Sequence, residues 1–189
     1  MNRINYPCKS IWRLIVPDGA VGASEDHFDL WNGTGATAVA AGHPGTKIIV
    51  DSIKVIAAGD VAITGAVGVN LHLHRTSAIG TAGTAATQNG TANTATTFNT
   101  VTPGGDTLTA DISARLKPTG GATLGSWLSQ TSILTEELGA GTYIDKWLID
   151  PLRDEPVVIL PGTGIKVIQG TVAGLGSIGF IVSFGIMGG

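Results

Sequence analysis

Apolar and polar side chains alternate with period two in three stretches of the chain, residues 67–76, 106–116 and 178–186. Such alternation is typical of half-buried β-strands, in which successive side chains point to opposite faces. On the first of these strands the polar face includes His72 and His74. The side chains predicted to face the core are Val67, Val69, Leu71, Leu73, Leu108, Ala110, Ile112, Ala114, Leu116, Ile178, Phe180, Val182, Phe184 and Ile186.

Shorter apolar runs separated by turn residues predict the rest of the fold. They cover residues 11–16, 27–32, 47–56, 122–133 (a strand or an extended loop), 142–149, 157–160 and 165–169. The clearest turn is Pro161-Gly162-Thr163-Gly164, and residues 134–138 form the only plausible helical turn. We therefore expect an all-β fold, a jelly-roll-like antiparallel β-sandwich of about eight strands with long inter-strand loops and little helix.

The chain divides into a lead-in and one domain. We interpret residues 1–26 as an N-terminal arm or an edge strand, in which Pro17-Asp18-Gly19 marks a turn, and residues 27–189 as the β-sandwich. Residues 77–105 are dominated by Thr, Ala, Gly and Asn and lack the bulky side chains needed for a core of their own. We expect this tract to be a long surface loop within the sandwich domain.

Composition excludes some classes of partner. Of the 189 residues, 13% are charged and 43% hydrophobic, and the formal net charge is −3. The absence of a basic patch argues against nucleic-acid binding. No run approaches the ~20 apolar residues of a membrane span, and residues 1–16 do not form a signal peptide, so we expect a chain made in the cytoplasm. Cys8 is the only cysteine and cannot form a disulfide within the chain.

His72 and His74 are the candidate metal ligands. They lie on one face of the same predicted strand, about 7 Å apart by strand geometry. With His27 or His43 as a third ligand, they could hold a metal ion. Two other interpretations stay open, namely a polar strand face without a ligand and a pH-sensitive subunit contact.

Other candidate motifs lack the context that their chemistry needs. The string Gly174 to Gly179 matches G-x-G-x-x-G, but a predicted strand follows it where a dinucleotide site requires a helix. Carboxylate pairs occur at Asp26/Asp29, Glu136/Glu137 and Asp154/Glu155, all in predicted loops or at strand ends. We expect these carboxylates to be solvated, and we predict no catalytic residue and no cofactor.

The order of segments resembles a known group of proteins. Phe28-Asp-Leu-Trp-Asn32 is followed by the β-run 47–56, and Leu71-His-Leu-His-Arg-Thr-Ser77 runs into the Gly/Thr/Ala tract. Leu108 to Leu116, then Glu155-Pro-Val-Val-Ile-Leu-Pro-Gly-Thr-Gly-Ile165 and the final strand complete the pattern. Over residues 27–187 this resembles tailed-bacteriophage virion structural proteins, among them capsid decoration (cement) proteins of jelly-roll type.

The resemblance implies a non-enzymatic virion protein made in the host cytoplasm. It would be a homotrimer on the capsid surface, bound where major capsid subunits meet, with no nucleic-acid or membrane partner. Residues 1–26 and 77–105 are the expected contact regions.

Two other functional classes remain. One is a tail or head-fibre adhesion module that binds a host receptor or glycan. The other is a small cupin-like metalloenzyme, which predicts that His72 and His74 point into the sandwich.

Overall fold

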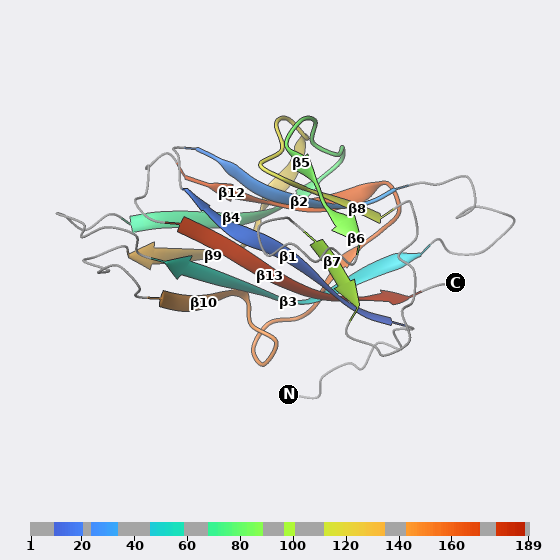
Figure 1. Cartoon of the computed structure of the whole chain (residues 1–189). Helices are drawn as coiled ribbons and strands as arrows, with labels where there is room; N and C mark the ends of the chain where they lie inside the picture. Colours follow the sequence, from blue (N-terminus) through green and yellow to red (C-terminus); the bar gives the residue numbers. More distant parts are fainter. Residues whose placement is uncertain are drawn as a thin grey trace, which may run out of the picture.

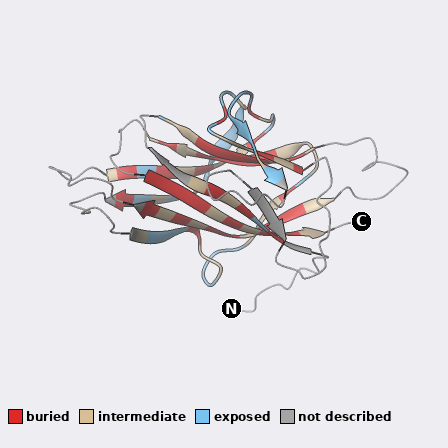
Figure 2. Ribbon diagram, in the orientation of Figure 1, coloured by how far each residue is buried: buried red, intermediate tan, exposed pale blue. Residues whose placement is uncertain are grey.

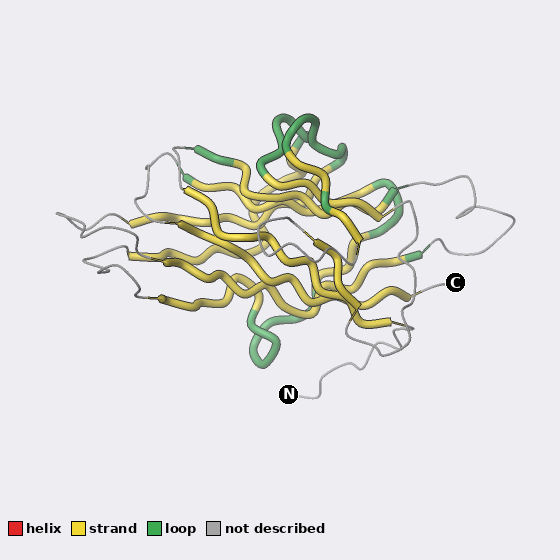
Figure 3. Tube along the Cα trace, viewed as in Figure 1, coloured by secondary structure: helices red, strands yellow, loops and turns green. Residues whose placement is uncertain are grey.

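The computed structural model of the chain describes residues 10–20, 24–33, 46–58, 68–88, 97–100, 112–134, 143–170 and 177–187. Within these ranges the chain forms two β-sheets packed against each other, and none of them contains a helix (Figures 1 and 3). Every strand pairing is antiparallel except that of β6 with β7. The predicted all-β antiparallel sandwich is confirmed.

One sheet has seven strands and the other has six. The first contains β1 (Ser10–Ala20), β3 (Lys47–Ala58), β6 (Thr87–Gln88), β7 (Thr97–Thr100), β10 (Tyr143–Ile149), β11 (Val157–Ile159) and β13 (Ser177–Met187). The second contains β2 (Asp26–Asn32), β4 (Gly68–Thr76), β5 (Thr84–Ala85), β8 (Ile112–Leu116), β9 (Thr123–Leu134) and β12 (Thr163–Gln169). The described residues form thirteen strands where about eight were expected, and eight of the thirteen have seven or more residues.

The long strands alternate between the sheets. The seven-stranded sheet has the order β10-β3-β13-β1-β7-β6, with β11 also paired to β3, and the six-stranded sheet has the order β5-β8-β2-β12-β4-β9. Of the steps between consecutive long strands, only that from β4 to β9 stays within one sheet. The first and last long strands, β1 and β13, are hydrogen-bonded neighbours.

The core lies between the sheets, where the facing sides of the strands are buried (Figure 2). Its largest buried side chains include Trp12, Phe28, Phe180 and Phe184. The inward faces predicted for the strands at 67–76 and 178–186 are buried wherever the structure describes them, apart from the half-buried Ile186. Each such large apolar side chain contributes about 1.5–3 kcal/mol through burial.

The expectation that residues 1–26 form an arm or an edge strand is wrong for β1. This strand pairs with β13 on one side and with β7 on the other, and its side chains Trp12, Leu14 and Val16 are buried in the core. Pro17 does not end the strand either. The register shifts between Val16 and Gly19, and a proline without an N–H is tolerated at such a bulge because the ladder is interrupted there.

The tract 77–105 is more structured than a plain surface loop. It supplies β5 to one sheet and β6 and β7 to the other. Residues 77–83 fold back over the sheet, where Gly80 N donates a hydrogen bond of 2.9 Å to Asp29 Oδ2 and Thr81 bridges to Thr119.

Several sequence predictions fall outside the described residues. They concern Cys8, His43, Leu108, Ala110, Glu136, Glu137 and the glycines at 174 and 176. The helical turn predicted at 134–138 also falls there, apart from Leu134, which ends β9.

The turn before β12 forms as its sequence predicts. Gly162 has φ +75°, a backbone conformation that favours glycine, and Thr163 N donates to Leu160 O at 3.1 Å. Gly164 is needed for a different reason. A Cβ there would lie 2.7 Å from Leu30 O and 2.8 Å from Thr76 Oγ1, so β12 approaches its neighbours too closely for a side chain.

Candidate interaction surface

A large bulge in β9 is the main irregularity of the six-stranded sheet. Ser129 pairs with Leu73 and Leu124 pairs with Arg75, so residues 125–128 of β9 lie opposite the single residue His74. Gly125 has φ +66° and lets the strand turn out of the sheet. We call residues 124–128 the β9 bulge.

The β9 bulge carries an unusual amount of exposed apolar surface. Trp127 is 51% exposed, and Leu124 and Leu128 are exposed to a similar degree. Three large apolar side chains within five residues form a local patch, whereas scattered single ones are normal on a protein surface. No pattern in the sequence indicates this patch, because the bulge interrupts the period-two alternation by which buried and exposed positions are recognised.

Trp127 packs on the two histidines that the sequence singled out. Its ring stacks on His72 with 4.5 Å between centroids and an interplanar angle of 18°, and it meets His74 edge-on at 6.3 Å. His72 and His74 are themselves 6.2 Å apart, centroid to centroid. Both histidines are half-buried on the outer face of the sheet, while Leu71 and Leu73 point into the core.

A charged pair lies beside His74. Lys166 Nζ contacts Asp26 Oδ2 at 3.0 Å and donates to Gly120 O at 3.3 Å, with both charged side chains largely buried. Burial lowers the pKa of His74, and the charges of His72 and Lys166 lower it further, against a smaller opposite effect of Asp26. His74 Nδ1 is buried and has no hydrogen-bond partner among the described residues.

The geometry does not favour the proposed metal site. His72 lies under the Trp127 ring, and no group of three His, Cys, Asp or Glu side chains in the described residues is placed to hold a metal ion. His27 cannot be the third ligand, because it is buried on the core side, where its ring lies 5.2 Å from that of Phe180 and its Nε2 is 3.1 Å from Gln169 Oε1. Burial lowers the pKa of His27. The inward-facing histidines of a cupin-like site are therefore absent from β4.

Asp26 and Asp29 have structural partners. Asp29 is buried, and its two oxygens accept hydrogen bonds from Gly80 N and Arg115 N. Burial raises the pKa of Asp29, although both hydrogen bonds oppose that shift. Asp26 pairs with Lys166 of β12. Asp154 and Glu155 are exposed, as expected, and Asp154 Oδ2 accepts from Asp150 N within its own turn. The expectation that Asp26 and Asp29 are solvated strand-end charges is wrong.

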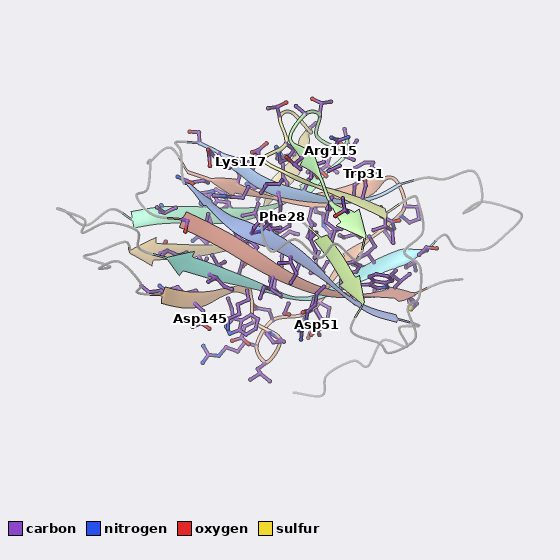
Figure 4. The ribbon with its side chains drawn as sticks, viewed as in Figure 1. Phe28, Trp31, Asp51, Arg115, Lys117 and Asp145 are labelled. Carbon is purple, nitrogen blue, oxygen red and sulfur yellow. The ribbon has the colours of Figure 1, made fainter. Side chains whose placement is uncertain are left out.

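Within the N-terminal contact region expected from the resemblance, residues 10–20 are not a free arm, because they lie within a sheet. The described part of the tract 77–105 is largely exposed at residues 81–87. Only the start of the tract lies close to the β9 bulge, since Ser77 N donates to Ala122 O at 3.0 Å, whereas β5 and β9 are at opposite edges of the six-stranded sheet. Figure 4 shows Arg115 and Lys117 beside these loops.

Comparison of the chain with protein-family models, with curated proteins and with solved structures finds no match. No helix long and apolar enough to cross a membrane occurs in the part of the chain that the structure describes. Any functional assignment therefore has to rest on the residues and their arrangement.

Proposed function

We propose that this chain is a non-enzymatic virion structural protein, a capsid decoration or cement protein that binds the head surface of a tailed bacteriophage as an oligomer and stabilises it. The observation that carries the proposal is the β9 bulge. Its exposed Leu124, Trp127 and Leu128 form an apolar patch of the kind that marks a protein–protein contact.

The patch has the properties of an interface centre. Tryptophan is enriched among the residues that dominate binding energy, and stacking on His72 already holds the Trp127 ring in place before any partner binds. Preorganisation of this kind reduces the entropy lost on association. A stable interface buries on the order of 1,200–2,000 Å², so surface around the bulge, including the exposed Ser77 and Ala78 that adjoin it, would have to join the contact.

The composition suits such a role. With 13% charged residues, the chain has few charges to desolvate when its surface is covered. Copies joined in a homotrimer would bind the shell through several weak contacts at once, and this multivalency raises the overall affinity. The proposed partners are further copies of this chain and the major capsid protein.

We also infer that the sandwich is a jelly roll. The eight long strands have the orders β1-β13-β3-β10 and β2-β12-β4-β9, and the remaining strands add to the sheets at their edges. Eight strands in two sheets of four, with consecutive strands mostly in opposite sheets, correspond to the double Greek key of that fold.

The test is to mix the purified chain with empty, expanded phage capsids assembled without it and to count the copies that sediment with each capsid. We expect saturable binding that Trp127→Ala weakens by at least about tenfold, as for an interface anchor. Trp147→Ala is the matched control, because Trp147 is also exposed but lies on β10 and outside the bulge.

A parallel arm uses host cells. Binding to cells without binding to capsids would replace the proposal with the tail or head-fibre adhesion module. Capsid binding that Trp127→Ala and Trp147→Ala weaken equally would remove the β9 bulge as the contact.

A further inference from the structure

A second exposed tryptophan, Trp147, lines a pocket away from the β9 bulge. The pocket has a volume of about 460 Å³ and lies between β10, Thr131 of β9 and the turn formed by residues 150–154. The edges of the two sheets meet here, since Ser129 Oγ donates to Leu148 O at 2.6 Å and Lys146 Nζ donates to Ser132 O at 2.8 Å. Figure 4 shows Asp145 beside this projecting turn.

The turn is held rigidly by its own hydrogen bonds. Asp154 Oδ2 accepts from Asp150 N at 2.8 Å, while Asp150 O accepts from Asp154 N at 2.9 Å and from Arg153 N at 3.1 Å. Asp150 Oδ1 also accepts from Leu152 N at 2.9 Å, and Asp150 Oδ2 lies 3.6 Å from Arg153 Nε. The side chains of Arg153 and Asp154, which line the pocket, therefore extend from a hydrogen-bonded turn.

The indole of Trp147 has a charged neighbour. The ammonium group of Lys54 lies 5.8 Å from its ring centroid and forms an ion pair with Asp145. The hydrogen bond from Lys54 lowers the pKa of Asp145, so this carboxylate stays ionised. Trp147 nevertheless remains 41% exposed and contributes to the lining of the pocket.

We propose that this pocket binds a saccharide. An exposed indole offers a flat apolar surface to the C–H face of a sugar ring. Carboxylates accept hydrogen bonds from hydroxyl groups, and Arg153 and Thr131 can donate to ring and hydroxyl oxygens.

Charge favours a neutral ligand over an ionic one. The carboxylates of Asp145, Asp150 and Asp154 are balanced by Lys54, Lys146 and Arg153, so three negative charges face three positive ones. The pocket is open, and its volume falls within the roughly 300–1,000 Å³ of small-molecule sites. These features fit one or two units of a larger glycan, bound weakly, and not an enclosed small molecule. The site does not rest on the proposed capsid function, because its residues are distinct from those of the β9 bulge.

The experiment follows the indole Nε1–H signal of Trp147 and the backbone amide signals of Thr131, Asp145 and Arg153 by NMR during titration with maltose, cellobiose, lactose and N,N′-diacetylchitobiose. We expect at least one of these disaccharides to shift the Trp147 signal saturably at millimolar to tens of millimolar concentration. Measured from the backbone amide signals, Trp147→Ala should weaken that binding by about tenfold or more, the loss expected for a stacking ring. Trp127→Ala should leave it unchanged.

A second variant tests the polar side of the pocket without disturbing the core. Arg153 is highly exposed, so Arg153→Ala should fold normally and weaken binding several-fold. If none of the four disaccharides shifts the Trp147 signal, or if the backbone amide shifts of the pocket residues survive with unchanged affinity in Trp147→Ala, the saccharide proposal is wrong. Its failure would be separate from that of the capsid proposal, since the two assays use different ligands and opposite tryptophan controls.

Discussion

Replacing Phe180 tests the assignment of β13 to the core. Phe180 is 1% exposed, and its ring lies 5.1 Å from Phe28 and 5.2 Å from His27, centroid to centroid. Phe180→Ala removes a buried aromatic ring and leaves a cavity between the sheets, which costs about 3–5 kcal/mol. A whole domain is stable by only about 5–15 kcal/mol, so the variant should fold but with a much reduced free energy of unfolding.

The assay is guanidinium chloride unfolding followed by circular dichroism. With a loss of about 4 kcal/mol and a denaturant slope of about 5 kcal/mol per molar, the midpoint should fall by about 0.8 M. Ile181→Ala is the matched control, because the neighbouring Ile181 is only half-buried on the opposite face of the same strand and should cost clearly less.

Two further variants sharpen the same test. Phe180→Asp places an unpaired carboxylate in the core and should abolish folding, because burying an uncompensated charge costs more than the domain can lose. The double variant with Phe28→Ala should reveal a coupling of about 0.5–1.5 kcal/mol between the two rings. Soluble, cooperatively folded Phe180→Asp protein would refute the reasoning.

Three other predictions follow from single residues. Gly164→Ala should lower the free energy of unfolding by about 1–3 kcal/mol, because the new Cβ meets Leu30 O and Thr76 Oγ1. The control Gly125→Ala has nothing within 4 Å of the new Cβ and should lose only the roughly 1 kcal/mol caused by its positive φ. Equal losses in the two variants would contradict the close approach of β12 to its neighbours at Gly164. Burial lowers the pKa of His27 from its ordinary value of 6.5. The stability that the neutral, buried His27 contributes is therefore complete above pH 6.5 and is lost as the pH falls from 6.5 towards the folded-state pKa. The free energy of unfolding should change there by at most about 1.4 kcal/mol per pH unit. Denaturation at a series of pH values should show this loss in the parent chain and a smaller one in His27→Gln, whereas an identical slope in the variant would exclude His27 as its source. Zinc added at one equivalent should leave the melting temperature unchanged, and a rise that His72→Ala removes would restore the metal site.

The strands whose side chains alternate cleanly could be predicted from sequence. β4 and β13 bury one face each, and the period-two pattern therefore records directly which side chains enter the core. The outward orientation of His72 and His74 followed from the same pattern.

Features that depend on distant partners could not be predicted. β1 lies inside a sheet because it pairs with β13, which is at the other end of the sequence, and no local signal distinguishes such a strand from an edge strand. Pro17 is compatible with either a turn or a bulge, and the choice depends on that pairing. The contact between Trp127 and His72 likewise requires the register of β9 against β4 together with the positive φ of Gly125.

The most direct test of the proposed function is the temperature at which empty, expanded phage capsids lose their integrity. Light scattering and electron microscopy would follow heating of capsids alone and of capsids saturated with the purified chain. The account predicts that bound protein raises the disruption temperature, that Trp147→Ala does the same, and that Trp127→Ala at equal concentration does not. An unchanged disruption temperature with the chain bound to saturation would contradict a cementing role, and absence of binding would contradict the capsid assignment itself.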